Sequence, residues 1–562
     1  MANSTLDDFS EIISSKYGFF PSPKKIGDIC FAGKLEIVDL NIFLEVRFFD
    51  EYLVSPPEVR LVDWKYDTQL RLALGKRHIS SDGILCYFDE SRDFWDSSQP
   101  IRQFLGAMER IHNILESSIS KKNTDSWLHD FNGYWNSSQK ILLNSKPQNK
   151  DELLQFFDGK HWWLSHENSD SSYIKKSKTS SRKWVTIKLP SCPIPRTEDW
   201  PPTSLRTMLI CLREIIDKPE KLIARSICKF RKREKEQKDF GIAFYWEDDI
   251  QSECIGLSFE LSEELHAAYK QGRYEGLSKL LLNKFITVPI ERYTLLRADP
   301  AFIHSRSLPT SYNTLKNKKV LLIGAGAIGG YLSKELSSLG AGWGTKGQLL
   351  IVDNDILTPS NIGRHYLGLK AIGKPKSIAL AESLKEDFPH LKITPLTESV
   401  FSSKDAFSQK PDLVINATGS ETVSVGLEKV LQKKFKDRPP IIHSWILGHG
   451  LAVQSFFRES ERNACFQCLW VSEGKDRKRK HEISKEPEKD LPKFAPCHQS
   501  FYPYVVNAAT TCASLTSQMI TNWLQGIDQP SLRSIVLQPD KCQNRKDTTP
   551  ERAKNCLVCG HI

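Results

Sequence analysis

The stretch that most constrains the fold is "KVLLIGAGAIGGYLSKELSSLG", residues 319–340. Four apolar residues lead straight into three glycines, Gly324, Gly326 and Gly329, and an amphipathic helix pattern follows them. Glycines at this spacing let the backbone press against a phosphate at a helix N-terminus, where free N–H groups favour an anion. The pattern predicts the first strand, loop and helix of a doubly wound parallel sheet.

The chain has 562 residues, too many for one hydrophobic core, and its patterns divide it into three predicted domains. Residues 1–120 hold a helix, alternating strands and a second helix, as in an α+β domain. Residues 121–300 mix aromatic-rich strands with amphipathic helices, which predicts a mixed α/β connector. Residues 301–562 alternate strand and helix from the glycine loop onward, which predicts an α/β doubly wound, Rossmann-like domain.

The charge pattern is that of an ordinary cytosolic protein. The formal charge of +10 is mild, and much of the basic excess lies in two runs, residues 229–238 and 474–490. Such runs are typical of solvated helix faces and loops, and no zinc-finger or aromatic RNA-binding pattern accompanies them. No segment approaches the roughly 20 apolar residues of a membrane helix, and we see no signal peptide. We therefore expect a cytoplasmic protein with no membrane and no direct nucleic-acid partner.

Charged residues follow the next predicted strand, "GQLLIVDND". Asp353 and Asp355 stand at its end, where a carboxylate can hydrogen-bond ribose in dehydrogenases and adenylating enzymes alike. Four further polar residues follow in the sequence: Asn361, Arg364, Lys374 and Lys376. A cationic cluster suits attack of a carboxylate on an α-phosphate, because negative charge builds on the transferring group and on departing pyrophosphate. Hydride transfer has no use for such a cluster, so the pattern favours ATP over NAD.

Three blocks, "LLIGAGAIGGYLSKELSSLGAG", "LIVDNDILTPSNIGRH" and "GKPKSIAL", together resemble the ThiF/MoeB and ubiquitin-activating superfamily of ATP-dependent adenylating enzymes. The resemblance implies ATP and Mg²⁺ as cofactors. The residues that it assigns to the nucleotide are Asp353 on the ribose, Asn361, Arg364 and Lys376 on the phosphates, and Asp355 close by. It also implies a homodimer in which an arginine before the glycine loop reaches the partner's site, and Arg306 is the candidate.

The chain departs from the family's pattern in "DLVINATGSETV", where Gly419 stands in place of the aspartate that organises magnesium. Either Glu421 or Asp355 takes over the metal, or the site is impaired and the chain is a scaffold that binds ATP without turnover. The sequence leaves these alternatives open.

Two C-x-x-C pairs stand in the second half of the chain, "CFQC" (Cys465, Cys468) and "CLVCG" (Cys556, Cys559). Thirteen cysteines in a cytosolic chain argue for metal or thiol chemistry, not for a disulfide framework. Four thiolates at this spacing can wrap one tetrahedral Zn²⁺ without an open position, which predicts a structural zinc site. The ThiF/MoeB family has the same pair-and-pair arrangement.

Between these pairs, Cys497 follows a charged loop and precedes an apolar helix. A helix N-terminus lowers the pKa of a thiol from its usual value of about 8.5. In activating enzymes a loop-borne cysteine there attacks the acyl adenylate, so the resemblance makes Cys497 the candidate nucleophile, with His498 helping to deprotonate it. Cys512 is the alternative, although its apolar surroundings in the sequence predict burial.

The front of the chain carries a second resemblance. "SPPEVRLVDW", "RHISSDGILCYFDE" and "DFWDSSQPIRQFLGAMERIHNIL" resemble, in order, three landmarks of ubiquitin-conjugating enzymes. The resemblance implies that Cys86 carries a thioester. The family's His-Pro-Asn element is altered, because His78 stands in place of the asparagine and Arg77 in place of the proline. An imidazole N–H of His78 can still donate to the tetrahedral oxyanion.

Conjugating part, connector and activating part in one chain resemble the CD-NTase-associated fusion proteins of bacterial CBASS anti-phage systems. The resemblance implies an ATP-dependent ligase that adenylates the C-terminus of a cGAS/DncV-like nucleotidyltransferase and primes it for antiviral signalling. The acyl group would pass from Cys497 to Cys86 and then to a target. The catalytic residues implied are Cys86, Cys497, His78, Arg364 and Lys376. The alternative is a sulfur-carrier or ubiquitin-like-protein adenylyltransferase of ThiF/MoeB type, which has no need of Cys86.

Overall fold

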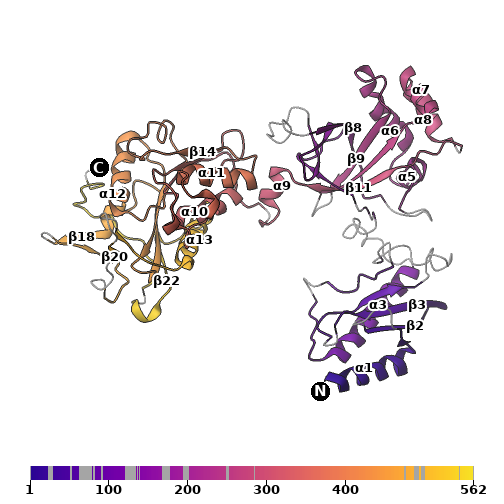
Figure 1. The fold of residues 1–562 in the computed structure, drawn as a ribbon, viewed down its shortest axis with the longest axis horizontal. Helices are drawn as coiled ribbons and strands as arrows, with labels where there is room; N and C mark the ends of the chain where they lie inside the picture. Colours follow the sequence, from indigo (N-terminus) through magenta and orange to yellow (C-terminus); the bar gives the residue numbers. More distant parts are fainter. Residues whose placement is uncertain are drawn as a thin grey trace. The chain divides into compact units, whose positions relative to one another are not determined.

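The structure is a computed structural model in which contacts between Cα atoms divide the chain into two compact units, Met1–Asp299 and Pro300–Ile562 (Figure 1). It describes residues 2–22, 29–50, 53–62, 79, 83–89, 93–120, 135, 137, 139–166, 178–193, 201–247, 252–283, 285–309, 311–473, 476–486, 493–494, 500–543 and 545–560.

The first unit begins with a four-stranded antiparallel sheet. Its elements are α1 (Ala2–Tyr17), β1 (Phe20–Pro21), β2 (Ile29–Ile37), β3 (Leu40–Phe48), β4 (Glu58–Leu61) and α3 (Pro100–Ile119). Alternate residues of β3, such as Ile42 and Leu44, point into one core with Phe104 and Ile111 of α3. This is the α+β arrangement that the sequence predicts, with Pro100 at the helix start, where its missing N–H costs nothing.

The connector region folds as a closed barrel in the order β10-β11-β5-β7-β6-β8-β9. Its strands are β5 (Lys140–Leu143), β6 (Glu152–Phe157), β7 (Trp162–Ser165), β8 (Lys178–Lys188), β9 (Asp239–Glu247), β10 (Ser252–Glu260) and β11 (Glu291–Arg297). Its helices are α5 (Leu205–Leu212), α6 (Pro219–Cys228), α7 (Glu263–Gln271) and α8 (Tyr274–Leu281). One strand face, including Trp184, Tyr245 and Tyr293, fills a small core, and the alternate face packs against these helices. The sequence predicts the element types here but not the closed barrel.

The second unit is built on a seven-stranded sheet in the order β14-β13-β12-β15-β16-β17-β22. Its strands are β12 (Lys319–Ile323), β13 (Gln348–Val352), β14 (Ile393–Leu396), β15 (Leu413–Asn416), β16 (Ile441–Leu447), β17 (Ala452–Arg458) and β22 (Leu532–Val536). Strands β14 to β16 of this order are parallel, and β17 and β22 add antiparallel pairs at one edge. The shorter strands are β18 (Trp470–Glu473), β19 (Asp476–Arg479), β20 (Lys493–Phe494) and β21 (Ser500–Phe501).

Helices cover both faces of this sheet. They are α9 (Pro300–Ser305), α10 (Ala327–Ser338), α11 (Lys376–Asp387), α12 (Glu421–Lys434) and α13 (Val506–Gln525). Leucines of α10, α11 and α13 share one core with Val320 and Leu322 of β12, whereas α12 packs on the other face with Leu321 and Ile323. The strand order reverses beside β12, and in open α/β sheets ligands bind at the carboxyl ends of strands at such a switch point.

A buried ionic group joins α12 to the sheet. Glu428 of α12 lies with Oε2 at 2.8 Å from Nε of Arg458, and with Oε1 at 3.5 Å from Nε2 of His443. The same Oε1 accepts a hydrogen bond of 3.2 Å from the backbone N–H of Phe466. Burial alone would raise the pKa of Glu428, but these partners hold it below its usual value. The carboxylate therefore stays charged and fixes the turn that follows Cys465.

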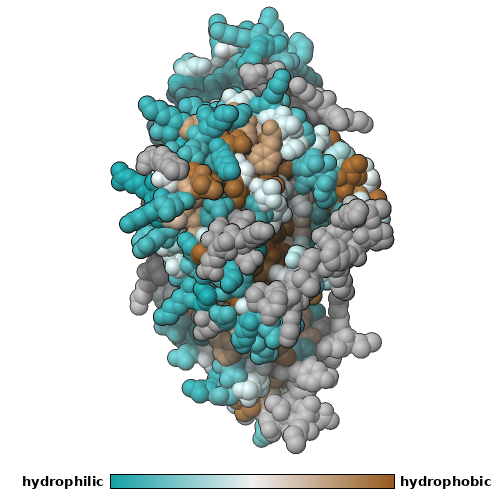
Figure 2. Space-filling model, turned by 90° about the vertical axis from the view of Figure 1, so that its left-hand side faces the viewer, coloured by the Kyte–Doolittle hydropathy of each residue, from teal (hydrophilic) through white to brown (hydrophobic). Residues whose placement is uncertain are grey.

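Among the described residues, none of the helices is both long and apolar enough to cross a membrane. Figure 2 shows one face of the molecule, on which brown apolar residues lie among teal polar ones. The exposed apolar side chains of the described residues include Val505 (72% exposed) and Leu557 (83% exposed).

Candidate functional site

A cavity of about 520 Å³ lies at the carboxyl ends of β12, β13 and β15. This volume is within the range of small-molecule sites. The sequence-predicted residues that line it are Gly324, Gly326, Asp353, Asp355, Asn361, Arg364 and Lys376. Gly329, Lys374 and Arg306 do not line it; Arg306 is exposed just after α9. We call it the nucleotide cavity.

Two of the three glycines of the loop, Gly324 and Gly329, leave no room for a side chain. Gly324 has a φ of +95°, and a Cβ there would lie 2.9 Å from the backbone nitrogen of Thr418. A Cβ on Gly329 would lie 1.8 Å from the carbonyl oxygen of Gly324, so this glycine lets α10 approach the loop and does not contact the cavity. Gly326, just before α10, has open space where a Cβ would stand, so a ligand can approach its backbone.

Asp353 fixes the loop against the end of β13. Its Oδ2 accepts from the N–H of Ala325 at 2.6 Å, and its Oδ1 accepts from the N–H of Asp355 at 2.8 Å. Burial raises the pKa of Asp353, and these two donors oppose that shift. At the first residue of α11, Nζ of Lys376 lies 2.8 Å from Oδ2 of Asp355. Lys376 is 8% exposed, so its ammonium is held in place by that carboxylate.

Of the two remaining cationic residues, Arg364 lines the cavity and Lys374 does not. Arg364 lines the cavity, donates from Nη1 to the carbonyl oxygen of Ser360 at 3.1 Å, and has its guanidinium 5.6 Å from the ring centre of Tyr504. Lys374 lies outside it, and its Nζ pairs with Glu382 at 2.7 Å. The prediction that Lys374 belongs to the phosphate cluster is therefore wrong, because its side chain does not line the cavity and pairs with Glu382 instead.

The sequence reasoning missed the role of His365, which directly follows Arg364. The N–H of Leu367 donates to its Nδ1 at 3.0 Å, so the proton is on Nε2, which donates to the carbonyl oxygen of Ala325 at 2.8 Å. Burial lowers the pKa of His365, and the nearby Lys376 and Arg364 lower it further. A neutral imidazole thus ties the glycine loop to the segment that carries Arg364.

The structure shows the surroundings of Gly419, the residue that stands in place of the aspartate expected from the sequence resemblance. Gly419 lines the nucleotide cavity with a φ of +67°. Glu421 does not line that cavity, and its Oε1 lies 2.5 Å from Nη2 of Arg479. Asp355 and the exposed Glu398, which sequence reasoning did not single out, are the carboxylates other than Asp353 that line it. Of the two residues proposed to hold magnesium, Asp355 has the suitable place.

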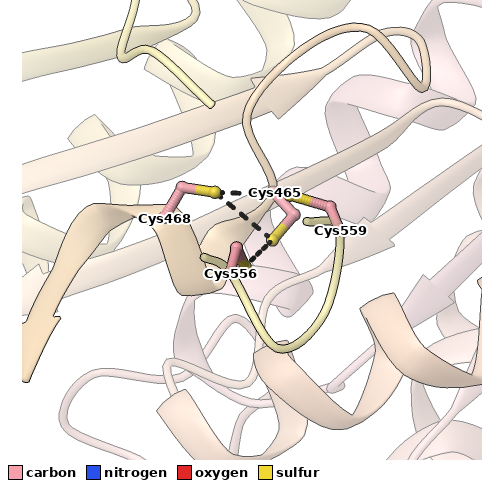
Figure 3. Close-up of side chains that lie close together, drawn as sticks. All are labelled: Cys465, Cys468, Cys556 and Cys559. Atoms are coloured by element: carbon pink, nitrogen blue, oxygen red, sulfur yellow. Dashed lines mark hydrogen bonds between the residues drawn. The ribbon is translucent and has the colours of Figure 1, made fainter. Parts of the chain in front are cut away.

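The four cysteines of the C-x-x-C pairs converge, as Figure 3 shows. Their sulfurs lie within 4.8 Å of one another, with 3.8 Å between Cys465 and Cys468, 3.5 Å between Cys465 and Cys556, and 3.4 Å between Cys468 and Cys559. A tetrahedral ion with Zn–S bonds of about 2.3 Å needs sulfurs about 3.8 Å apart. All four residues are buried, and the set fits a closed structural zinc site.

Cys512 lies inside α13, is fully buried, and directs its Sγ toward the carbonyl oxygen of Trp445 at 3.6 Å. Burial raises the pKa of its thiol well above the usual range. Cys512 is therefore a core residue. Cys497 and His498 lie outside the described residues, and their roles stay predictions.

Cys86 is exposed between two buried neighbours. Leu85 is 4% exposed, and its N–H donates to the carbonyl oxygen of Val59 in β4 at 2.8 Å; Tyr87 is 8% exposed, and its hydroxyl donates to the carbonyl oxygen of Pro57. These anchors hold the Cys86 side chain at the surface, where another molecule can reach it. His78 and Arg77 lie outside the described residues.

Comparisons with known proteins agree with this arrangement. A model of the ThiF family matches residues 302–559, and a model of prokaryotic E2 family B matches residues 35–143. The ATP-dependent ubiquitin transferase-like protein Cap2 of Pseudomonas aeruginosa (strain BWHPSA011 / Pa011) is 26% identical over 518 residues, 91% of this chain and 90% of that protein. Its namesake in Escherichia coli (strain TW11681) is 27% identical over 530 residues, 86% and 85% of the two chains.

Among solved structures, E. coli MccB with ATP is 16% identical, covers 46% of this chain and 69% of that chain, and has a TM-score of 0.33.

The two family models and the nucleotide cavity define a fusion of a ubiquitin-conjugating-like domain with a ThiF-type adenylation domain. A ThiF adenylation domain implies ATP and Mg²⁺. Over most of its length the chain is similar to the ATP-dependent ubiquitin transferase-like proteins named Cap2.

Proposed function

We propose that this enzyme adenylates the C-terminal carboxylate of a partner protein, captures the acyl group on Cys497 and transfers it to Cys86. The observation that carries the proposal is the nucleotide cavity, where the glycine loop, Arg364 and Lys376 line one space. A phosphate-binding backbone beside two cations is what attack on an α-phosphate requires.

In the first step, a carboxylate oxygen of the substrate attacks the α-phosphorus of ATP, and the bond to pyrophosphate breaks. The backbone of Gly326 approaches the phosphates, while Arg364 and Lys376 balance the charge that develops on them. Asp353 lies at the ribose. Magnesium, held by Asp355, would neutralise phosphate charge, and the ion pair with Lys376 positions that carboxylate. His365 holds the glycine loop and the segment that carries Arg364 in fixed positions relative to each other.

The second stage passes the acyl group between sulfurs. His498 takes the proton of the Cys497 thiol, the thiolate attacks the acyl carbon, and AMP leaves. The Cys86 thiolate then attacks the thioester carbon, and the Cys497 sulfur departs. When a target amine attacks the Cys86 thioester, an amide bond forms, the C–S bond breaks to restore the Cys86 thiolate, and the amine releases a proton to solvent; His78 donates to the oxyanion. Exposure of Cys86 supports this role. The two thiols share one chain, so the second transfer has an effective concentration of roughly millimolar order.

The acyl substrate we propose is the C-terminus of a cGAS/DncV-like nucleotidyltransferase, conjugated to prime CBASS antiviral signalling in the cytoplasm. A homodimer through the adenylation domain, with Arg306 reaching the partner's cavity, is part of the same proposal. Support comes from exposed Arg306 and from its absence from the cavity of its own chain. The proposal also includes a structural Zn²⁺ ion bound by the four cysteines.

The test is incubation with ATP and the nucleotidyltransferase, followed by non-reducing gels. Two thiol-sensitive adducts are expected. The Cys497→Ala variant should keep ATP–pyrophosphate exchange and lose both adducts; Cys86→Ala should lose only the second. Cys512→Ala is the matched control and should keep both. Persistence of the full reaction in Cys86→Ala would instead favour a sulfur-carrier or ubiquitin-like-protein adenylyltransferase, and ATP binding without exchange would favour a scaffold.

A further inference from the structure

A second cavity, of about 340 Å³, adjoins the nucleotide cavity. Four residues line both: Gly419, Ile446, Gly448 and Tyr502. The two spaces therefore meet along the carboxyl ends of β15 and β16. None of the residues that the sequence assigns to ATP lines the second cavity. We call it the side pocket.

The border between the two cavities is formed partly by glycine. Gly419 has a φ of +67°, and no atom lies within 4 Å of where its Cβ would stand. Gly448 also has a positive φ, of 48°. At Gly419 the border thus lacks a side chain at the place where related enzymes carry a carboxylate. A chain of extended polypeptide can cross this border, because a glycine leaves room for another backbone to approach closely.

The wall of the side pocket is mixed. Its buried polar residues include Ser424, Ser444 and Gln454, which are hydrogen-bonded within the protein, and most of the rest of the buried wall is apolar. Its buried apolar residues are Leu447, Phe466, Leu469 and Leu532. Two tryptophans, Trp445 and Trp470, complete the wall, and the rings of Trp445 and Phe466 meet edge to face with centroids 5.6 Å apart. A ligand side chain that covers such apolar surface contributes binding free energy of about 25 cal/mol per Å² of apolar area removed from water.

The charged groups of the side pocket are matched within the protein. Glu421 pairs with Arg479, whose guanidinium also lies 5.1 Å from the Trp470 ring centre. Oε1 of Glu482 accepts from the N–H groups of Ile483 and Ser484 at 2.9 and 3.0 Å. Burial lowers the pKa of His481, which favours its neutral form. A charged ligand group would have to break one of these pairings, and an uncharged one would not.

We infer that the side pocket receives a large apolar or aromatic side chain of the acyl substrate, from a residue shortly before its terminal carboxylate. The inference rests on the proposed function, because the carboxylate must lie in the nucleotide cavity. The substrate backbone crosses at Gly419, and the apolar side chain packs against Trp445 and Trp470. The ion pair of Glu421 and Arg479 lines the pocket and disfavours acidic or basic side chains there. The pocket thereby selects substrates by sequence.

The experiment uses the full-length enzyme and variants of the nucleotidyltransferase. In each variant one of the residues just before the C-terminal residue is replaced by Phe, Gly or Asp. The readout is kcat/KM for ATP–pyrophosphate exchange. At one position, Phe should exceed Gly and Asp by about tenfold or more, since a filled apolar pocket is worth about 1–3 kcal/mol. The Trp470→Ala variant should reduce that preference to about twofold or less while exchange continues.

Val471→Ala is the matched control, because Val471 is the next residue of β18 and does not line the pocket. It should keep the full preference. Equal rates for Phe, Gly and Asp at every position, or an unchanged preference in Trp470→Ala, would overturn the inference while leaving the proposed function intact. No exchange with any substrate variant would count against the proposed function itself.

Discussion

Nε of Arg458 lies 2.8 Å from Oε2 of Glu428, and the two side chains are only 1% and 0% exposed. Glu428 also accepts a hydrogen bond from the N–H of Phe466, next to the first cysteine of the four-cysteine cluster. One buried carboxylate thus connects α12, β17 and the turn that follows Cys465, and its loss leaves a buried guanidinium without its partner.

The Glu428→Gln variant should lose about 3–5 kcal/mol of stability, because removing one partner of a buried pair leaves the other charge uncompensated. For a domain of this size the thermal midpoint should fall by about 10 °C. Differential scanning fluorimetry measures it. Glu382→Gln is the control, since Glu382 pairs with Lys374 at 2.7 Å and both side chains are about half exposed. Equal shifts in both variants would contradict the structural role of the buried pair.

Lys376→Ala should reduce ATP–pyrophosphate exchange by about 10²–10³-fold, because a cation aimed at the phosphates and held by Asp355 is lost. Lys374→Ala removes the same charge two residues away, outside the cavity, and should stay within about twofold of wild type. The pair of variants separates a site effect from a change in net charge. If both variants fell equally, the phosphate role of Lys376 would be wrong.

Gly329→Ala should weaken ATP binding without touching the ligand. Its new methyl group would stand 1.8 Å from the carbonyl oxygen of Gly324, so the glycine loop or α10 must shift. Overpacking of this kind typically costs about 1–3 kcal/mol. Gly363→Ala, where no atom lies within 4 Å of the added Cβ, is the control. Calorimetric titration with ATP measures both, and the prediction fails if Gly329→Ala binds as wild type does.

The second unit should lose stability in acid. Burial lowers the pKa of His304, and burial with the adjacent His304 lowers that of His390 to about 4. Their Nε2 atoms lie 2.8 Å apart. Below about pH 6.5 the unfolded chain therefore binds more protons than the folded one, and stability falls as pH decreases toward 4.

The measurement for this prediction is the thermal midpoint between pH 7.5 and 4.5. His390→Leu should flatten the acid limb of the curve, because it removes the group with the larger shift. The exposed His161, exchanged for Gln, is the control and should leave the slope unchanged. An acid limb of the same steepness in His390→Leu would show that other groups carry the effect.

Purified enzyme should contain about one zinc ion per chain, and Cys556→Ser should lose it. Because metal binding at such sites contributes directly to folding, the variant should also unfold at a lower temperature. Elemental analysis and fluorimetry measure the two effects. Cys542→Ser alters a buried thiol outside the cluster and should keep the metal. Full zinc content in Cys556→Ser would remove that residue from the ligand set.

Much of the second unit was predictable because its determinants are local. Each of its signals lies within a few residues of sequence: the glycine spacing around Gly324, the acidic strand end at Asp353 and the two C-x-x-C pairs. The barrel was not predictable in the same way, because its closure depends on parallel pairs such as β11 with β5, far apart in sequence. Lys374 shows a similar limit of sequence reasoning. It lies only two residues before Lys376, yet it forms a surface ion pair whereas Lys376 lines the cavity.

The four-cysteine cluster has a mechanical consequence for the proposed nucleophile. Cys465 and Cys556 stand 91 positions apart and meet at their sulfurs. A bound ion would hold these two residues together and so close the chain between them, in which Cys497 lies, into a loop. A chelator that removes the ion would open this loop without altering any of the residues proposed for catalysis.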